Sequence, residues 1–359
     1  MRHPYKSSPN FTKWRNAVSD IPHELVDPVV NFRFKILKTD KVATAGSCFA
    51  QHIAKNLIKS GFNYYVTEIP HPIIKDVALN LGYGAFSARY GNIYTCRQLL
   101  QLIKRAFNLF TTTDSFWLNK NDDFIDPLRP TIQKNGFISL EELDADRHNH
   151  LAAVRDMFKN LTFFVFTLGL TECWVNKRCG TAYPLCPGVA AGTYDPELHT
   201  FINFGVNDVV ADLTEFFNLL KMVNPNAKLI LTVSPVALAA TAEHRHVLLS
   251  NCYSKSVLRV AADMMTSYSD DIAYFPSYEI ITGIHARENF NESDLRNVTD
   301  AGVAKVMNLF FKHATSDASA GSDKTDAIAS EVQSQSDTNL MKAFSNILKI
   351  ECDEEMLDK

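Results

Sequence analysis

A serine and a cysteine stand side by side at a turn that can expose either of them for chemistry. Gly46 is followed by Ser47 and Cys48, between a short apolar run and apolar residues at helical spacing. A side chain at such a strand-to-helix turn is held at the top of the sheet, where the amides of the helix start lower the pKa of a thiol and can receive an oxyanion. Cys48 would then attack an ester or thioester carbonyl. A free cysteine is also a small apolar residue that fills space, and the spacing alone favours neither interpretation.

Strands and helices alternate along the chain, and this alternation predicts the scaffold that positions the turn. Buried strands are predicted at 161–168, 227–233 and 272–275, each preceded by a helical pattern, at 144–159, 209–223 and 253–268. The pattern predicts an α/β fold with three α/β/α layers and a mainly parallel sheet covered on both faces. Two segments with weak periodicity, 63–143 and 173–207, are predicted as insertions that form the walls of a cleft, the first with a helix at 96–107.

Polar and small residues follow each predicted strand. The turn at Ser47 follows the first strand, and segments 169–172, 234–235 and 277–279 follow the others. Because ligands of parallel sheets bind beyond the carboxyl ends of the strands, we expect a site at this edge. Glu172 and Glu279 can orient a histidine or contact a substrate hydroxyl there, or each can cap a helix.

The composition excludes some classes of partner. The 359 residues carry a net charge of −4 and no run rich in Lys and Arg, so no nucleic-acid partner is expected. No apolar stretch reaches the length of about 18 residues that a membrane span needs, and the first residues do not form a signal peptide, so we expect no membrane span and a cytoplasmic location. The oligomeric state is left open by the sequence.

The cysteines predict neither disulfides nor a metal site. Seven cysteines, an odd number at irregular spacing, occur in a chain large enough to fold without disulfides, so we expect reduced thiols. Cys173, Cys179 and Cys186 stand farther apart than the ligands of a zinc knuckle, and no second pair follows them.

The end of the chain differs in composition from the body. We predict one domain over 1–313, a disordered linker over 314–338 that is rich in Ser, Ala, Asp, Thr and Gln, and a tail over 339–359. Apolar residues at helical spacing in 339–350 predict a short amphipathic helix, which either docks on the body or a partner or forms only transiently.

The segment Gly46-Ser-Cys-Phe-Ala50 is the signature of the GSCFA family, which this chain resembles. Further blocks that look like the family lie at 86–94, 167–172, 231–236, 253–259 and 274–280, and the resemblance covers 1–313. The family in turn resembles the SGNH (GDSL-type) hydrolases. The resemblance therefore implies an SGNH-hydrolase or flavodoxin-like form of the three-layer fold.

The resemblance to SGNH hydrolases implies roles at the first two turns. The third residue of their Gly-Asp-Ser turn is the nucleophile, which puts Cys48 in that place and leaves Ser47 as the alternative nucleophile or as a support of the turn. Their oxyanion donors correspond to Gly169 and Thr171. A threonine is a weaker and differently directed donor than the asparagine of the superfamily, which argues against efficient ordinary esterase chemistry.

The SGNH base belongs to an Asp-x-x-His pair, and here Asp294 is followed by Asn297 in the histidine's place. Since an amide cannot accept the proton, another histidine must act if the chain is a catalyst. His52 lies one helical turn beyond the thiol and leans toward it. His246 follows the third strand and His285 the fourth, and either is a candidate acid or base.

Several side chains are candidates for substrate contact. Glu172, Glu279 and Asn297 are the predicted substrate-binding residues, and Asp294 with Arg296 would bind an acidic or polyhydroxyl ligand if the pair faces the cleft. Four aromatic residues offer stacking surfaces for a sugar ring: Tyr90, Tyr94, Trp174 and Tyr183.

The prediction from the sequence is an acyl hydrolase or O-acyltransferase whose nucleophile is Cys48 or Ser47. By resemblance the acyl group is acetyl, and the substrate is a small-molecule or carbohydrate ester. A hydrolase needs only water and no cofactor, whereas a transferase needs acetyl-CoA or a similar donor. The alternative is a non-catalytic binding or scaffold protein of the same architecture, because Thr171 and Asn297 depart from the catalytic pattern.

Overall fold

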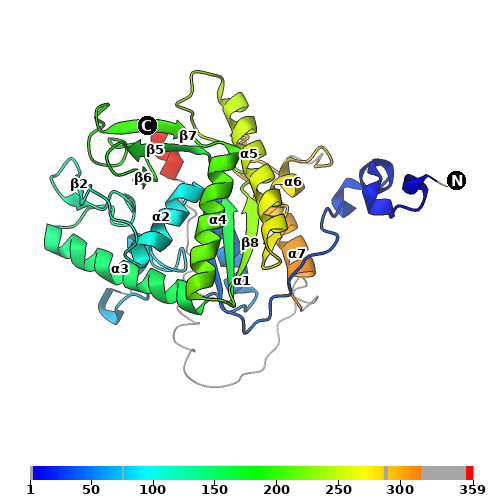
Figure 1. Cartoon of the computed structure of the whole chain (residues 1–359), viewed down its shortest axis with the longest axis horizontal. Coiled ribbons are helices and arrows are strands. Elements are labelled where there is room, and N and C mark those ends of the chain that lie inside the picture. Colours follow the sequence, from blue (N-terminus) through cyan, green and yellow to red (C-terminus); the bar gives the residue numbers. More distant parts are fainter. Residues whose placement is uncertain (1–2, 75–76, 287–289, 317–352, 359) are drawn as a thin grey trace.

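The computed structural model describes residues 3–74, 77–286, 290–316 and 353–358. At its centre lies a four-stranded parallel sheet in the order β1-β4-β8-β9 (Figure 1). Its strands are β1 (Val42–Gly46), β4 (Phe163–Leu168), β8 (Lys228–Val233) and β9 (Ile272–Tyr274). Each lies in a predicted apolar run, because strands buried on both faces of a parallel sheet carry few polar residues.

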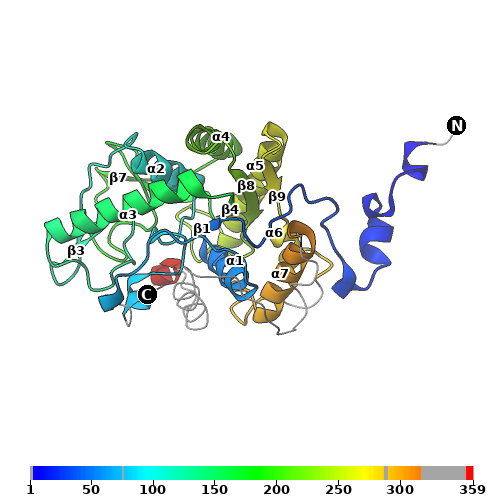
Figure 2. The ribbon, with the colours of Figure 1, turned by 90° about the horizontal axis from the view of Figure 1, so that it is seen from below.

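Helices cover both faces of this sheet (Figure 2). On one face, an apolar cluster joins the sheet to α1 (Cys48–Lys59), α6 (Ser277–Thr282) and α7 (Asp300–Ala314). On the other face, a second cluster joins it to α2 (Cys96–Ala106), α3 (Leu140–Asn160), α4 (Val206–Val223) and α5 (Val247–Tyr268). The predicted α/β fold with three layers and a parallel sheet is confirmed.

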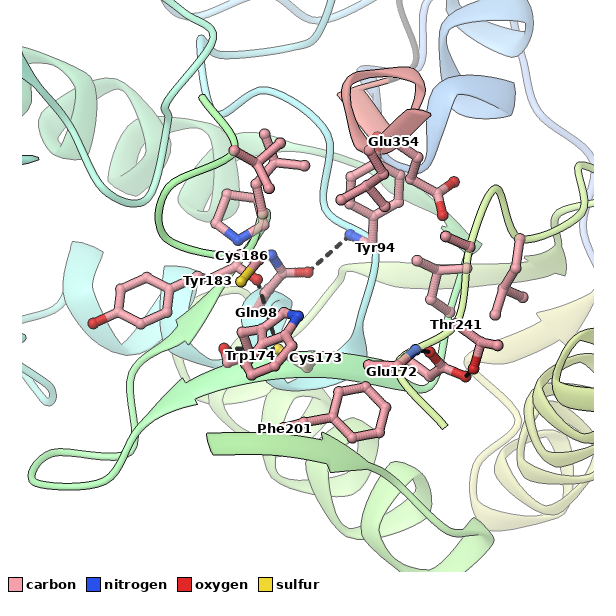
Figure 3. A pocket seen from close by; sticks show the side chains of 18 residues that line it. Tyr94, Gln98, Glu172, Cys173, Trp174, Tyr183, Cys186, Phe201, Thr241 and Glu354 are labelled. Carbon is pink, nitrogen blue, oxygen red and sulfur yellow. Dashed lines mark hydrogen bonds between the residues drawn. The ribbon is translucent and has the colours of Figure 1, made fainter. Parts of the chain in front are cut away.

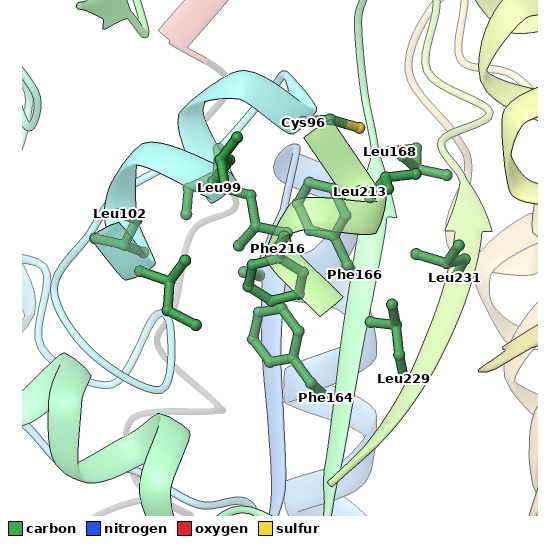
Figure 4. Packing of buried hydrophobic residues seen from close by; sticks show 14 of the residues in the cluster. Cys96, Leu99, Leu102, Phe164, Phe166, Leu168, Leu213, Phe216, Leu229 and Leu231 are labelled. Atoms are coloured by element: carbon green, nitrogen blue, oxygen red, sulfur yellow. The ribbon is translucent and has the colours of Figure 1, made fainter. Parts of the chain in front are cut away.

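Alternate residues of β4 serve the two clusters. Phe164 and Phe166 pack toward α4, where the ring of Phe164 lies 5.7 Å from that of Phe216 (Figure 4). Phe163 and Val165 belong to the cluster on the opposite face. Since full burial of a side chain of this size stabilises the fold by about 1.5–3 kcal/mol, β4 is a main contributor to the core.

Capping side chains set where the helices begin. Thr95 accepts a hydrogen bond from the amide of Gln98, and the side chain of Gln98 accepts one from the amide of Thr95, which closes a capping box at the start of α2. The helix α5 begins at Val247, earlier than the predicted start at 253. There Nδ1 of His246 accepts the amide of Leu248, so a histidine replaces the usual small polar cap.

The two insertions form small sheets. An antiparallel sheet in the order β6-β5-β7 consists of β5 (Glu172–Asn176), β6 (Ala182–Tyr183) and β7 (His199–Asn203). The earlier insertion holds α2, as predicted, and the hairpin of β2 (Trp117–Leu118) and β3 (Phe124–Ile125). Because β5 begins four residues after β4 ends, the three-stranded sheet stands beside the carboxyl edge of the central sheet.

Short helical turns complete the described chain: η1 (Pro4–Lys6), η2 (Asn10–Thr12), η3 (Arg15–Ser19), η4 (His23–Leu25), η5 (Pro72–Ile74), η6 (Ala78–Leu81) and η7 (Asp353–Asp358). The first four project from the body (Figure 1). No helix within the described ranges has the length and apolar character that crossing a membrane requires.

The last helix of the body extends slightly beyond the predicted domain boundary at 313. The helix α7 includes Ala314, and the buried Thr315 pairs with Ile36. Residues 317–338 of the predicted linker and the predicted helix at 339–350 lie outside the described residues.

Candidate functional site

The turn between β1 and α1 depends on close contact with the neighbouring strand. Gly46 has a φ of +139°, and a Cβ atom placed on it would lie 2.3 Å from the carbonyl oxygen of Thr167. Glycine alone fits both this backbone conformation and this contact. The turn therefore places the next residue, Ser47, at the N-cap of α1.

The side chain of Ser47 faces the turn that follows β4. Its Cβ atom lies 3.1 Å from the position that a Cβ atom on Gly169 would take. Its hydroxyl is buried and has no hydrogen-bond partner among the described residues. Because an unsatisfied buried polar group costs about 1–3 kcal/mol, a hydroxyl of this kind marks a position where a ligand or water completes the bonding.

Cys48 lies in different surroundings from Ser47. It is the first residue of α1, is 3% exposed, and belongs to the apolar cluster that α1 shares with α6 and α7. A substrate can contact a thiol packed in this way only when α1 moves relative to α6 and α7. The resemblance puts Cys48 in the nucleophile's place and leaves Ser47 as the alternative, whereas the surroundings of the two residues favour Ser47.

The two predicted oxyanion donors already make hydrogen bonds within the protein. The amide of Gly169 donates to the carbonyl oxygen of Tyr94 at 3.2 Å. The hydroxyl of Thr171 donates to Oδ1 of Asn203 at 2.7 Å, and its amide donates to the hydroxyl of Ser254 at 3.1 Å. A role in holding an oxyanion would require these bonds to be exchanged, and it stays a prediction.

A buried lysine that sequence reasoning missed reaches the same turn. Lys255 of α5 is 1% exposed, and its Nζ atom donates to the carbonyl oxygen of Gly169 at 2.8 Å. The sequence does indicate that Lys255 is buried, because it lies three residues before Leu258 and seven before Ala262, on the otherwise apolar stripe of α5. A lysine at such a position is either a buried structural cation or part of a site.

Arg296 is a second cation at this edge. Its Nε atom donates to the carbonyl oxygen of Ala237 at 3.0 Å, and its Nη2 atom donates to Glu354 at 2.9 Å. Asp294 holds the turn that carries it, since its Oδ1 atom accepts the amides of Arg296 and Asn297 at 2.9 and 3.0 Å. The side chain of Asn297 donates to the same carboxylate. Asp294 and Asn297 thus position Arg296, and it is Arg296 that reaches the site.

The three candidate histidines do not bond to Ser47. Burial lowers the pKa of His52 to about 4, although the charge of Asp300 in α7 opposes this shift, so the ring is neutral at pH 7; it packs beside Phe49. His246 is exposed at the cap of α5. His285 lines a separate hollow near Pro22, and burial lowers its pKa.

Of the two candidate glutamates, Glu172 lines a cavity beside the β6-β5-β7 sheet, and Glu279 does not. Its carboxylate accepts the hydroxyl of Thr241 at 2.7 Å and the amide of Ala242 at 3.3 Å, and burial raises its pKa. Glu279 accepts Nε of Arg259 at 2.6 Å and the hydroxyl of Tyr274 at 2.7 Å. These bonds tie α6 to α5, so they account for Glu279 without a ligand.

A cavity of about 330 Å³ opens between the central sheet edge and the β6-β5-β7 sheet (Figure 3). Of the four aromatic residues predicted for stacking, Tyr94, Trp174 and Tyr183 line it, whereas Tyr90 is buried with its hydroxyl on the carbonyl of Thr44. Leu170, which follows Gly169, also lines it. The cavity is thus mainly apolar, with Glu172 on one side and Glu354 on the other.

The described part of the chain brings together no group of three or more His, Cys, Asp or Glu side chains that could hold a metal ion. Cys173 is a buried residue of β5, and burial raises the pKa of its thiol to about 12. A thiol in that state is a poor metal ligand, because metals bind the thiolate.

These features define a class of protein: a three-layer α/β/α domain with a serine-bearing turn, a buried lysine and a partly buried arginine at the carboxyl edge of its sheet. The model of the GSCFA family matches residues 41–310, and the chain belongs to this family. The match runs from the residue before β1 into α7, and so includes the whole central sheet and the lining of the cavity except Glu354 and Leu357. No curated protein matches the chain.

Proposed function

We propose that this GSCFA protein is an SGNH-like acyl hydrolase or O-acyltransferase in which Ser47 is the nucleophile. The observation that carries the proposal is the buried Ser47 hydroxyl, which faces Gly169 without a hydrogen-bond partner among the described residues. The helix start beneath it attracts the negative charge that develops on an acyl oxygen. Leu170, the residue after Gly169, lines a cavity of about 330 Å³, which would hold the rest of an ester.

In the proposed reaction, the Oγ atom of Ser47 attacks the acyl carbonyl and forms a serine ester as the alcohol leaves. Water then releases the acid in a hydrolase, or a sugar hydroxyl takes the acyl group in a transferase. We assign proton acceptance to His52, which is neutral at pH 7 and lies on the same helix; because it does not bond to Ser47 in this structure, the transfer requires an intervening water or a change of its rotamer. By resemblance to SGNH hydrolases, the acyl group is acetyl and the alcohol a carbohydrate, with Trp174 as a stacking surface.

A non-catalytic binding protein is the second candidate. It is favoured by the hydrogen bonds that already engage Gly169 and Thr171, and by the absence of a histidine bonded to Ser47 within the described residues. A protein of this kind would use the cavity, together with Lys255 and Arg296 near its Glu354 side, to hold a ligand without turnover.

Turnover of p-nitrophenyl acetate by the wild type and by variants of Ser47, Cys48 and His52 separates the two candidates. We expect Ser47→Ala to lose nearly all activity and His52→Ala to lose about 10²–10⁴-fold, whereas Cys48→Ala retains it once its folding is verified. Ser60→Ala, a serine at the other end of α1, is the matched control. Full activity in Ser47→Ala would exclude Ser47 as the nucleophile, and no turnover by the wild type would favour the binding protein.

A further inference from the structure

The C-terminal turn η7 lies against the candidate site through two acidic side chains. Asp353 and Glu354 are each 6% exposed, although both carry carboxylates and stand close to the end of the chain. Glu354 and Leu357 also line the cavity beside the β6-β5-β7 sheet (Figure 3). Buried carboxylates are costly unless they are paired, so the surface that receives them must supply the compensating groups.

Uncharged side chains form hydrogen bonds with Asp353. Nδ2 of Asn92 donates to its carboxylate at 3.0 Å, and its amide donates to the hydroxyl of Tyr94 at 3.0 Å. Asn92 is itself held by Gln51 of α1, whose Nε2 atom donates to it at 3.1 Å. The groups that contact Asp353 are therefore fixed by the segment before α2 and by the helix that Ser47 caps.

Positively charged side chains contact or attract the carboxylate of Glu354. Nη2 of Arg296 donates to its carboxylate at 2.9 Å, Lys255 attracts it, and the amide of Ala239 donates to it. Burial nevertheless raises the pKa of Glu354, so its surroundings are enclosed enough to penalise a charge that lacks these partners. The position suits a carboxylate and would be costly for a neutral apolar group.

This set of groups exists independently of η7. Lys255 is placed by the carbonyl of Gly169, and Arg296 by the carbonyl of Ala237 and the Asp294 turn. These residues lie within the 41–310 segment that matches the family, whereas 353–358 lies outside it. The pocket for carboxylates thus belongs to the domain, and η7 is an occupant supplied by the same chain.

We infer that Lys255 and Arg296 form a carboxylate-binding subsite of the candidate active site, and that residues 353–358 occupy it as an intramolecular competitor, with Asn92 and Tyr94 holding Asp353 beside it. The cognate ester, an identification that rests on the proposed function, carries a carboxylate that replaces the side chain of Glu354. Because Lys255 contacts the carbonyl of Gly169, this carboxylate binds next to the turn that faces Ser47.

Binding of a labelled peptide tests the subsite without any need for catalysis. The probe is a fluorescein-labelled peptide of residues 351–359 with serine for its cysteine, and its affinity for the full-length protein is measured by fluorescence anisotropy. The tethered copy competes at an effective concentration on the order of 1 mM. Glu354→Ala weakens the binding of the tethered residues 353–358 to the subsite. We therefore expect this variant to bind the added peptide about tenfold more tightly than the wild type does.

Glu355→Ala is the matched control, because Glu355 is a neighbouring glutamate whose side chain is 55% exposed and lies 3.9 Å from Arg296. Its affinity for the peptide should stay within about twofold of the wild type, since exposed pairs of this length contribute little. Adding Arg296→Gln to Glu354→Ala should abolish the tighter peptide binding. Adding Arg296→Lys instead, which keeps the charge, should retain part of it. Equal peptide binding by all variants would overturn the inference.

Ester turnover then separates the subsite from the proposed reaction. In Glu354→Ala, we expect kcat/KM for 4-acetoxybenzoate, an acetyl ester that carries its carboxylate on the alcohol side, to exceed that for its neutral methyl ester by about tenfold, and Arg296→Gln to remove the preference. Peptide binding without turnover of either ester would overturn the proposed function and retain the carboxylate subsite. Turnover that shows no preference for the acidic ester, together with no peptide binding, would retain the reaction and overturn the subsite.

Discussion

The ammonium group of Lys255 donates to the carbonyl oxygen of Gly169 at 2.8 Å, and this bond joins α5 to the turn that faces Ser47. The lysine is 1% exposed, so its charge is stable there only because neighbouring groups compensate it. The same contact fixes the β4 turn and places a positive charge beside it. The same side chain therefore holds the β4 turn in place and supplies a positive charge to the proposed carboxylate subsite.

Replacing Lys255 by methionine tests the structural part of this contact. Lys255→Met keeps the length of the chain in an apolar stripe but leaves the carbonyl of Gly169 without this donor, so we expect the free energy of unfolding to fall by about 1–3 kcal/mol. Urea denaturation measures it. Lys312→Met, at an exposed ion pair with Asp27, should change it by less than about 1 kcal/mol. Equal effects of the two substitutions would contradict a structural role for the buried lysine.

The thiols should differ in reactivity according to their burial. Cys252 is exposed, whereas Cys48 is 3% exposed within an apolar cluster, so Cys252 should react rapidly with Ellman's reagent and Cys48 only on unfolding. Cys252→Ser should remove one rapidly reacting thiol, and Cys48→Ala should remove none. A rapid thiol that disappears in Cys48→Ala would restore the cysteine as a nucleophile.

The sequence predicts the central sheet well because the physical reason for its pattern is local. Phe163, Phe164 and Val165 are apolar in succession since both faces of β4 are covered, and no tertiary knowledge is needed to recognise such a run. The three-stranded sheet of β5, β6 and β7 was not predicted. Its strands are short, and β6 spans only Ala182–Tyr183, so pairing across the insertion rather than local pattern defines them.

The sequence also predicts the edge of the sheet that carries the site, but not all of the side chains that meet there. Ser47 and Cys48 differ by one position, and the helix start turns one toward Gly169 and the other into the apolar layer. Lys255 and Arg296 reach the edge from α5 and from a late turn, because buried carbonyl oxygens hold them. Contacts between residues so far apart in the chain cannot be recognised from spacing.

The stability of the protein should fall in acid because of a buried histidine. Nδ1 of His150 lies 2.7 Å from Glu68, and burial, assisted by the charge of Arg129, lowers the pKa of His150 to about 4. The histidine is therefore neutral in the folded protein and donates its proton to the carboxylate. Its contribution to stability is complete above pH 6.5, the ordinary histidine pKa, and is lost as the pH falls from 6.5 toward 4.

The size of this loss is about 3 kcal/mol, and urea denaturation between pH 7 and pH 4 measures it. His150→Gln removes the titrating group, so the variant should lose less stability over this range, although it is less stable at pH 7. His246→Gln, at an exposed cap, is the control and should keep the pH dependence of the wild type. An unchanged slope in His150→Gln would show that other groups cause the acid sensitivity.

Two glycines at opposite ends of α1 separate the effects of backbone conformation and crowding. Gly46 and Gly61 both have positive φ, at +139° and +74°. A Cβ atom on Gly46 would meet the backbone of Thr167 at 2.3 Å, whereas one on Gly61 would meet nothing within 4 Å. Gly61→Ala should therefore cost only the conformational strain of about 1–2 kcal/mol.

Gly46→Ala should cost this strain and the clash together, about 3 kcal/mol or more, because β1 must move away from β4. Urea denaturation of both variants gives the difference. The movement also displaces Ser47 from Gly169, so Gly46→Ala should lose ester turnover under conditions where it remains folded, while Gly61→Ala keeps it. If the two variants lost equal stability, close contact between Gly46 and Thr167 would not be what fixes this turn, and the placement of the Ser47 hydroxyl would need another cause.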